Sequence, residues 1–141
     1  MVMSDGIFSI IGSALNAQDM RMSAIASNLA NSSSIAKPGE QPYRAHEVVL
    51  QAASDGDETG NGTGLGVQVA GVVQSNAPVT MKYDPGSPDA NAQGYVMGSN
   101  VSPVEEMVNM IDSSNSYAAS VALLQQTSRI DQDMINSFQV T

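Results

Sequence analysis

The acidic segment that begins at Asp55 holds the residues of the chain that most resemble a metal-binding loop. Aspartate, glutamate, threonine and glycine alternate from Asp55 to Gly60. A calcium loop of the EF-hand type that started at Asp55 would need a bidentate carboxylate at its twelfth position. That position is Gly66, which has no side-chain ligand. We therefore expect a solvated loop between residues 55 and 64, and no metal site.

Catalytic patterns are equally incomplete. His46 is the only histidine, cysteine is absent, and no serine is flanked as in Gly-x-Ser-x-Gly. The alternating glycines between Gly60 and Gly66 match neither a dinucleotide fingerprint nor a P-loop. We therefore expect no catalytic, cofactor-binding or metal-binding residues, and a protein that is not an enzyme. The alternative is an enzyme or binding module that uses His46 and the acidic loop.

Charge and hydropathy point to protein partners. The chain has 141 residues, with 5 basic and 14 acidic side chains, and a formal net charge of −9. Nucleic acids and anionic membrane surfaces do not attract such a protein. No stretch approaches the ~20 apolar residues of a membrane-spanning helix, and no cleavable signal peptide is visible. We expect neither nucleic-acid binding nor direct membrane insertion.

The segment from Val101 to Phe138 predicts one long helix. Ser102 and Glu105 form a capping-box pattern, and Pro103 occupies the first helical position. About 38 residues would span roughly 57 Å, longer than the about 37 Å diameter of a compact domain of this length. Its apolar face therefore needs a partner or a second copy. Apolar residues recur at helical spacing, at Val104, Met107, Val108, Ile111, Ala118, Val121, Ala122, Ile130, Met134, Ile135 and Phe138.

The N-terminal segment predicts a second long helix, capped by Ser4 or Asp5 and ending near Asn31. Its spacing in steps of three and four is typical of heptad a and d positions. These positions are Phe8, Ile11, Leu15, Gln18, Met22, Ile25 and Leu29. Because neither helix has cover of its own, we expect both to become ordered on assembly.

The middle of the chain alternates at period two, which predicts short strands at residues 43–50, 65–73, 78–83 and 94–97. The expected fold is α+β: long N- and C-terminal helices pair as a coiled coil, and a small antiparallel β insert projects sideways between them. The expected parts are the N-terminal helix at 1–34, the insert at 35–100 and the C-terminal helix at 101–141.

Two segments carry a family resemblance. Residues 25–31 read Ile-Ala-Ser-Asn-Leu-Ala-Asn, and residues 100–111 read Asn-Val-Ser-Pro-Val-Glu-Glu-Met-Val-Asn-Met-Ile, followed by Ser116-Tyr117. They resemble the terminal signatures of the flagellar axial proteins of the rod and hook. The short length, with Tyr43-Arg44-Ala45 and Gly94-Tyr95-Val96, resembles the proximal-rod members.

The resemblance implies a structural subunit of the flagellar basal-body rod in the periplasm, which transmits torque for motility. Copies would assemble helically, with the terminal helices around a central export channel and the β insert outside. The implied partners are other copies, the rod proteins FlgB and FlgF, the adaptor FliE and the flagellar type III export apparatus. A subunit of another type III secretion-related or coiled-coil assembly is the alternative.

Asn28 and Asn31 lie three residues apart on one helix face, where their amides can hydrogen-bond across a subunit interface. A helix C-cap is the alternative for Asn31, and local helix packing is the alternative for Tyr117. The predicted assembly interface comprises Phe8, Ile11, Leu15, Met22, Ile25, Asn28, Leu29, Asn31, Val104, Met107, Val108, Ile111, Tyr117, Ala118 and Val121.

Overall fold

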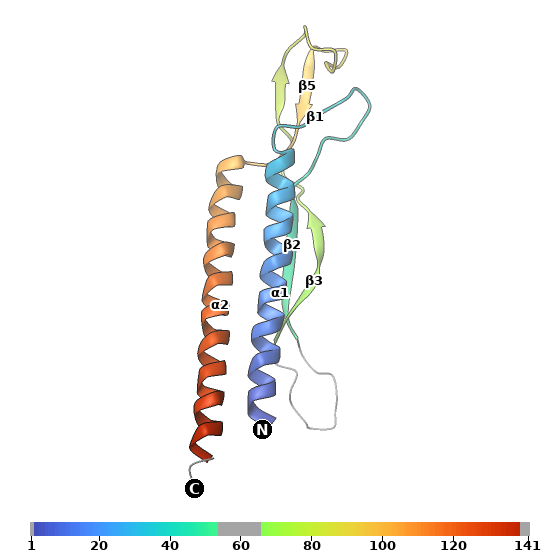
Figure 1. Cartoon of the computed structure of the whole chain (residues 1–141). Coiled ribbons are helices and arrows are strands. Elements are labelled where there is room, and N and C mark those ends of the chain that lie inside the picture. Colours follow the sequence, from blue (N-terminus) through green and yellow to red (C-terminus); the bar gives the residue numbers. More distant parts are fainter. Residues whose placement is uncertain (1, 54–65, 139–141) are drawn as a thin grey trace, which may run out of the picture.

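A computed structural model describes residues 2–53 and 66–138 of the chain. Two long helices, α1 (Val2–Asn31) and α2 (Pro103–Phe138), lie side by side and run in opposite directions (Figure 1). Both predicted helices are confirmed. The chain ends lie at the same end of this pair (Figure 1).

The helix boundaries follow local signals, with two corrections. Helix α1 already includes Val2, so Ser4 and Asp5 lie inside its first turns and do not cap it. Helix α2 starts at Pro103, and its first backbone bond runs from Glu106 N to Ser102 O at 3.0 Å. No side-chain bond joins Ser102 to Glu105 among the described residues, so the reciprocal capping box does not form.

The residues between the helices form two antiparallel sheets. One has the strand order β1-β5-β4 and the other pairs β2 with β3. The four predicted strands are confirmed with shifted ends. Strand β1 was not predicted, because it follows the first helix too closely to show the period-two alternation of a strand. The strands are β1 (Ile35–Ala36), β2 (His46–Ala53), β3 (Gly66–Gln74), β4 (Met81–Tyr83) and β5 (Tyr95–Gly98).

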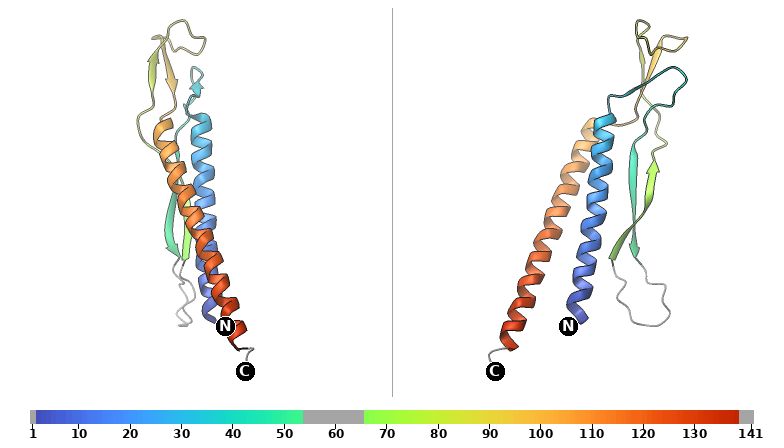
Figure 2. Two further views of the ribbon diagram at one scale, coloured as in Figure 1. Left: turned by 60° about the vertical axis from the view of Figure 1, so that its left-hand side comes forward. Right: turned by 45° about the vertical axis from the view of Figure 1, so that its right-hand side comes forward.

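The β2–β3 hairpin packs along α1, so α1 lies between α2 and this hairpin (Figure 2). Ser13 of α1 accepts a hydrogen bond from the backbone N–H of Val67 at 3.1 Å. A Cβ at Gly66 would lie 2.8 Å from the Ser13 hydroxyl oxygen, so the strand reaches this close only without a side chain. The expected sideways insert is therefore wrong for β2 and β3, while the other sheet extends beyond the helices (Figure 1).

Helix α2 faces α1 with small residues. Ser113 is fully buried, and Ala17 on α1 is 1% exposed. Small side chains let the two helices approach closely. Several bulky residues of α2 are exposed instead: Val104 is 72% exposed and Ile111 is 62% exposed, whereas Met110, Val121 and Leu124 are half-buried. The α+β class is confirmed, and most of the apolar stripe predicted for α2 is exposed in the subunit, whereas Val121 is half-buried.

We predict that Gly94→Ala destabilises the β4–β5 turn by about 1–2 kcal/mol. Gly94 has φ +79°, and an added Cβ would lie 3.0 Å from the Tyr83 ring. The measurement is the thermal unfolding of the purified variant. Gly86→Ala is the matched control, because the nearest atom to its Cβ is 3.9 Å away. Equal unfolding temperatures for the two variants would contradict this account.

Candidate functional site

The side chain of Asn28 joins three elements at the upper end of the helix pair. It is 1% exposed. Its Nδ2 donates to the backbone carbonyl of His46 on β2 at 2.9 Å and to Oε2 of Glu106 on α2 at 3.1 Å. Its Oδ1 accepts from the His46 backbone N–H at 2.8 Å and from the Tyr43 hydroxyl at 3.1 Å. Both donors and both lone pairs of the amide are therefore used.

These contacts determine the hydrogen positions on His46. Since Asn28 Oδ1 accepts a backbone N–H, it is the amide oxygen, and the Tyr43 hydroxyl must donate its hydrogen to it. The His46 Nδ1 lies 3.0 Å from the same hydroxyl and must then donate to it. His46 thus orders the junction, and within the described residues its ring nitrogens contact Tyr43 and Gln74.

Asn100 forms a second polar junction, which the sequence analysis did not assign. Its Oδ1 accepts from the Ala45 N–H at 2.7 Å, and its Nδ2 donates to the carbonyls of Ser75 and Ala77 at 3.2 and 3.0 Å. Arg44 Nη1 donates to the same two carbonyls. Asn100 therefore ties the start of α2 to the ends of the β2–β3 hairpin. Its sequence signals were its place directly before the predicted helix and at the start of the segment that resembles the family signature, but neither identified its partners.

Asn31 has a more local role. Its Nδ2 donates to the Ser27 carbonyl of its own helix at 2.8 Å. The adjoining chain is held by Ser99, which is 2% exposed and donates from Oγ to the Ser32 carbonyl at 2.6 Å. Within the subunit, Asn31 therefore serves the end of α1, as the capping alternative described.

The predicted assembly residues fall into three groups. Those buried inside the subunit are Ile11, Ile25 and Asn28. Those that are half-buried are Phe8, Leu15, Met22, Leu29, Asn31 and Val121. Those that are exposed are Val104, Met107, Val108, Ile111, Tyr117 and Ala118. The residues of the first group are buried by contacts inside the subunit. The exposed group remains our prediction for the surface that contacts neighbouring subunits.

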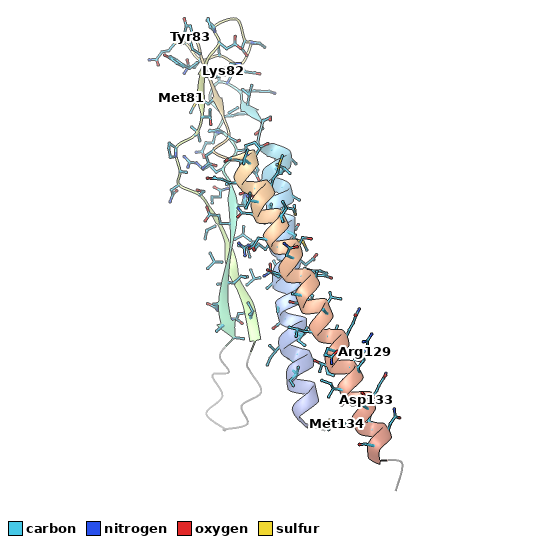
Figure 3. The ribbon with its side chains drawn as sticks, turned by 90° about the vertical axis from the view of Figure 1, so that its left-hand side faces the viewer. Met81, Lys82, Tyr83, Arg129, Asp133 and Met134 are labelled. Atoms are coloured by element: carbon cyan, nitrogen blue, oxygen red, sulfur yellow. The ribbon has the colours of Figure 1, made fainter. Side chains whose placement is uncertain are left out.

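The outward face of α2 is uncovered along the helix. We use this term for the exposed side that bears Val104, Met107, Val108 and Ile111 near the start and Arg129 and Asp133 near the end. Figure 3 shows Arg129 and Asp133 on α2, turned away from α1. Moving one such large apolar side chain out of water is worth about 1.5–3 kcal/mol. The exposed large residues of α2 are Val104, Met107, Val108, Ile111, Tyr117, Leu123, Ile130, Met134 and Ile135.

Two cavities flank the helices. One of about 420 Å³ adjoins the Asn28 junction and is lined by polar groups including Arg21, Glu47 and Glu106. The other, of about 570 Å³, lies between Phe8 and Leu124, where the helices diverge toward the chain ends (Figure 2).

Neither a metal site nor a membrane span is found in the described ranges. No cluster of three or more ligating side chains occurs in 2–53 and 66–138. The helices of these ranges also lack the length and apolarity that crossing a membrane requires. The acidic loop at 55–64 lies outside the described residues.

Comparison with known proteins decides the family. The flagellar basal-body rod protein FlgC of Escherichia coli O6:H1 is 50% identical over 119 residues, which cover 84% of this chain and 85% of the relative. FlgC of Salmonella typhimurium LT2 is 50% identical with the same coverage, and FlgC of Bacillus subtilis is 39% identical over 131 residues, or 84% and 87% of the two chains. The chain belongs to the FlgC family of flagellar basal-body rod proteins. The family model of the flagellar basal body rod FlgEFG protein C-terminal region also matches, at residues 92–137.

Membership of the FlgC family identifies a structural subunit of the flagellar basal-body rod, not an enzyme. The family resemblance, the structural function and the location in the basal body that the sequence indicated are thus confirmed. The matched region 92–137 contains Asn100, Glu106 and the outward face of α2. The second half of the helix pair therefore carries both the partner of Asn28 and the uncovered surface.

We predict that Asn28→Ala lowers the free energy of unfolding by about 2–4 kcal/mol, because it leaves buried partners on β2 and α2 without hydrogen bonds. The measurement is urea unfolding of the purified chain. Asn31→Ala is the matched control from the same motif and should cost less than about 1 kcal/mol, since it loses one bond to its own helix. A smaller effect at Asn28 than at Asn31 would contradict the junction.

Proposed function

We propose that this FlgC-family subunit builds the rod by packing the outward face of α2 against neighbouring subunits. The exposed apolar residues of that face carry the proposal. The chain has 9810 Å² of accessible surface, whereas a compact protein of 14.6 kDa has about 6,900 Å². The surface of the chain thus exceeds that of a compact protein of the same mass by about 2,900 Å². The shape therefore suits a subunit that is completed by its neighbours.

The proposed assembly is helical and made of many copies. Contacts between two different surfaces of one subunit repeat without closing, as a helical rod requires. In this arrangement the terminal helices surround the export channel and pack as coiled coils, and the segment 35–100 lies outside. Torque would pass along the rod through these helices across the periplasm.

The proposed neighbours follow from the family resemblance. They are other copies, FlgB, FlgF and the adaptor FliE, and the flagellar type III export apparatus delivers the chain. The uncovered α2 supports protein neighbours in general. The acidic charge of −9 favours neighbours that present basic or neutral surfaces.

We predict that Ile111→Asp abolishes rod assembly and swimming. Ile111 is 62% exposed in the subunit, so the change leaves the fold intact but places a charge in the buried interface of the rod. The measurement is swimming in soft agar, together with electron microscopy of isolated basal bodies.

Ile111→Leu is the matched control, because it keeps the apolar contact at the same position. It should assemble and swim normally. Helicity and unfolding of the free Ile111→Asp chain should equal those of the parent chain. Normal rods in the Ile111→Asp strain would remove the outward face of α2 from the interface.

We further predict that α2 is the less stable helix of the free subunit. Its buried Ser113 contacts α1 with a small side chain, and within the described residues a buried polar atom without a partner lies on each helix, at Ser113 of α2 and Gln18 of α1. Helix α1 is held on both sides, by α2 and by the hairpin. Local opening is easiest where few apolar contacts form.

Limited trypsin digestion tests this difference. Arg129 is the only basic residue of α2, whereas Arg21 of α1 is half-buried. Trypsin should cut the free chain at Arg129 before Arg21. In assembled rods, both arginines should be protected from cleavage. Fragment masses identify the sites. Cleavage at Arg21 first would mean that α2 is firmly packed before assembly.

A further inference from the structure

A pad of methionine and tyrosine side chains lies at the upper tip of the molecule. Strand β4 pairs with β5 so that Met81 lies opposite Met97 and Tyr83 lies opposite Tyr95. Residues that lie opposite each other, or two apart on one strand, share a face of the sheet. These four side chains therefore form one surface, which we call the Met–Tyr pad. Met81 is 65% exposed and Tyr83 is 63% exposed, and Figure 3 shows both at the tip.

The Met–Tyr pad is preformed in the free subunit. The rings of Tyr83 and Tyr95 pack edge to face with their centroids 5.2 Å apart. The Tyr83 ring also lies against Gly94, since a Cβ there would be only 3.0 Å from it. A surface that is already ordered loses little conformational entropy on binding, and methionine and tyrosine are enriched in the cores of protein interfaces. The pad therefore has the order and the composition of a binding surface.

The face of this sheet is a better docking surface than its edge. Strand β4 is an outer strand in the order β1-β5-β4, so one of its edges is unpaired within the described residues. This edge is only three residues long, and its middle residue is the exposed Lys82. Short edge strands and lysine side chains oppose pairing with a strand of another chain. We therefore expect a partner to cover the pad and not to extend the sheet.

Charge is distributed unevenly along the molecule. The segments 32–45 and 75–100, which lie at the upper end (Figure 1), contain three basic and three acidic residues and are neutral. The rest of the chain contains 2 basic and 11 acidic residues and therefore carries the whole net charge of −9. A neutral end approaches such an acidic surface without like-charge repulsion, whereas two acidic surfaces repel each other. The upper end is thus the part of the molecule best suited to contact the acidic part of another copy.

The β2–β3 hairpin offers an apolar surface in that acidic part. Val49 is 42% exposed and Val73 is 48% exposed. Glu47 lies opposite Val73, and Val49 is two residues further along β2, so all three side chains share one face. Val48 and Leu50 on the other face are half-buried. We call the exposed side, with Glu47, Val49 and Val73, the valine face of the hairpin.

We propose that the Met–Tyr pad of one copy docks on the valine face of the hairpin in the next copy along the rod. The pad lies beyond the end of the helix pair (Figure 1), so a chain that covers it must extend further along the long axis. This inference rests on the proposed function and adds a contact between the β segments to that of the helices. The two surfaces differ, so the contact is heterologous and repeats from copy to copy.

The pad is too small to join two free chains by itself. Its four side chains cover much less than the area of about 800 Å² that each partner buries in a stable interface. The contact therefore acts together with the helix contacts, which hold the two surfaces near each other in the rod. Its loss should weaken the assembled rod and leave the fold of the free chain unchanged.

Chemical cross-linking tests the contact directly, because the chain has no cysteine. Met81→Cys and Val73→Cys are introduced on separate chains with different tags, which are expressed together in a strain without the parent chain. Isolated basal bodies are treated with a short bismaleimide, and the products are analysed by electrophoresis and mass spectrometry. Mixed dimers joined through positions 81 and 73 are expected.

The matched control combines Met81→Cys with Gln68→Cys, which is exposed on the same hairpin strand about 15 Å from position 73. It should give several-fold less mixed dimer. An equal yield in the control would overturn the proposal, as would dimers between two Met81→Cys chains or a link from position 81 to a different basal-body protein. These results would leave the role in the rod intact, since the chains tested are recovered in basal bodies. Absence of the tagged parent chain from basal bodies would instead contradict the proposed function, and the contact with it.

A charge exchange provides the second measurement. Met81→Lys or Val73→Asp alone places a charge in the apolar contact and should reduce swimming several-fold. The two changes in one chain bring opposite charges together between copies and should restore swimming toward the parent rate. Both sites are exposed, so the free variants should unfold at the parent temperature. A double variant that swims no better than the worse single variant would overturn the contact.

Discussion

The buried amide of Asn28 is the contact on which the arrangement of this subunit depends. Its side chain bonds to both neighbours of α1, β2 and α2, at the same time. An amide that uses both donors and both lone pairs fixes the positions of all its hydrogen-bond partners. The junction therefore sets the height of α2 against α1 and the distance of the hairpin from α1.

This register explains why the subunit is unfinished on its own. With Glu106 turned toward α1, the residues two positions on either side, Val104 and Val108, must point away, because each residue rotates by about 100°. The polar contact thus lies inside the subunit and the apolar surface lies outside. In a protein that folds alone, the apolar residues would face α1 and the polar residue would face the solvent. Apolar burial is the main driving force of folding.

Local signals predicted most of the fold. Pro103 and the long periodic segment after it located α2, and period-two alternation located four strands, because these patterns depend on neighbouring residues. The sequence could not predict which side of α2 contacts α1, since periodicity reveals an apolar stripe but not what covers it. It also missed the fold-back of the hairpin and the bonding of Asn28 and Asn100, whose partners are 15 to 78 residues away. Asn28 was expected at a subunit interface, and the hydrogen bonds described for its side chain all lie inside the chain.

Separating the two kinds of contact allows folding and assembly to be adjusted independently along one helix. Hydrogen bonds at the junction are directional and specify one arrangement, while contributing only about 0.5–1.5 kcal/mol each to stability. Apolar contacts are larger and non-directional, so their exposure before assembly would favour non-specific association unless the rigid junction presented them in one geometry. The hairpin supplies that rigidity, because it holds α1 from the side opposite α2. A rod subunit that must pass from a free chain to a stiff assembly therefore needs its polar interior as much as its apolar exterior.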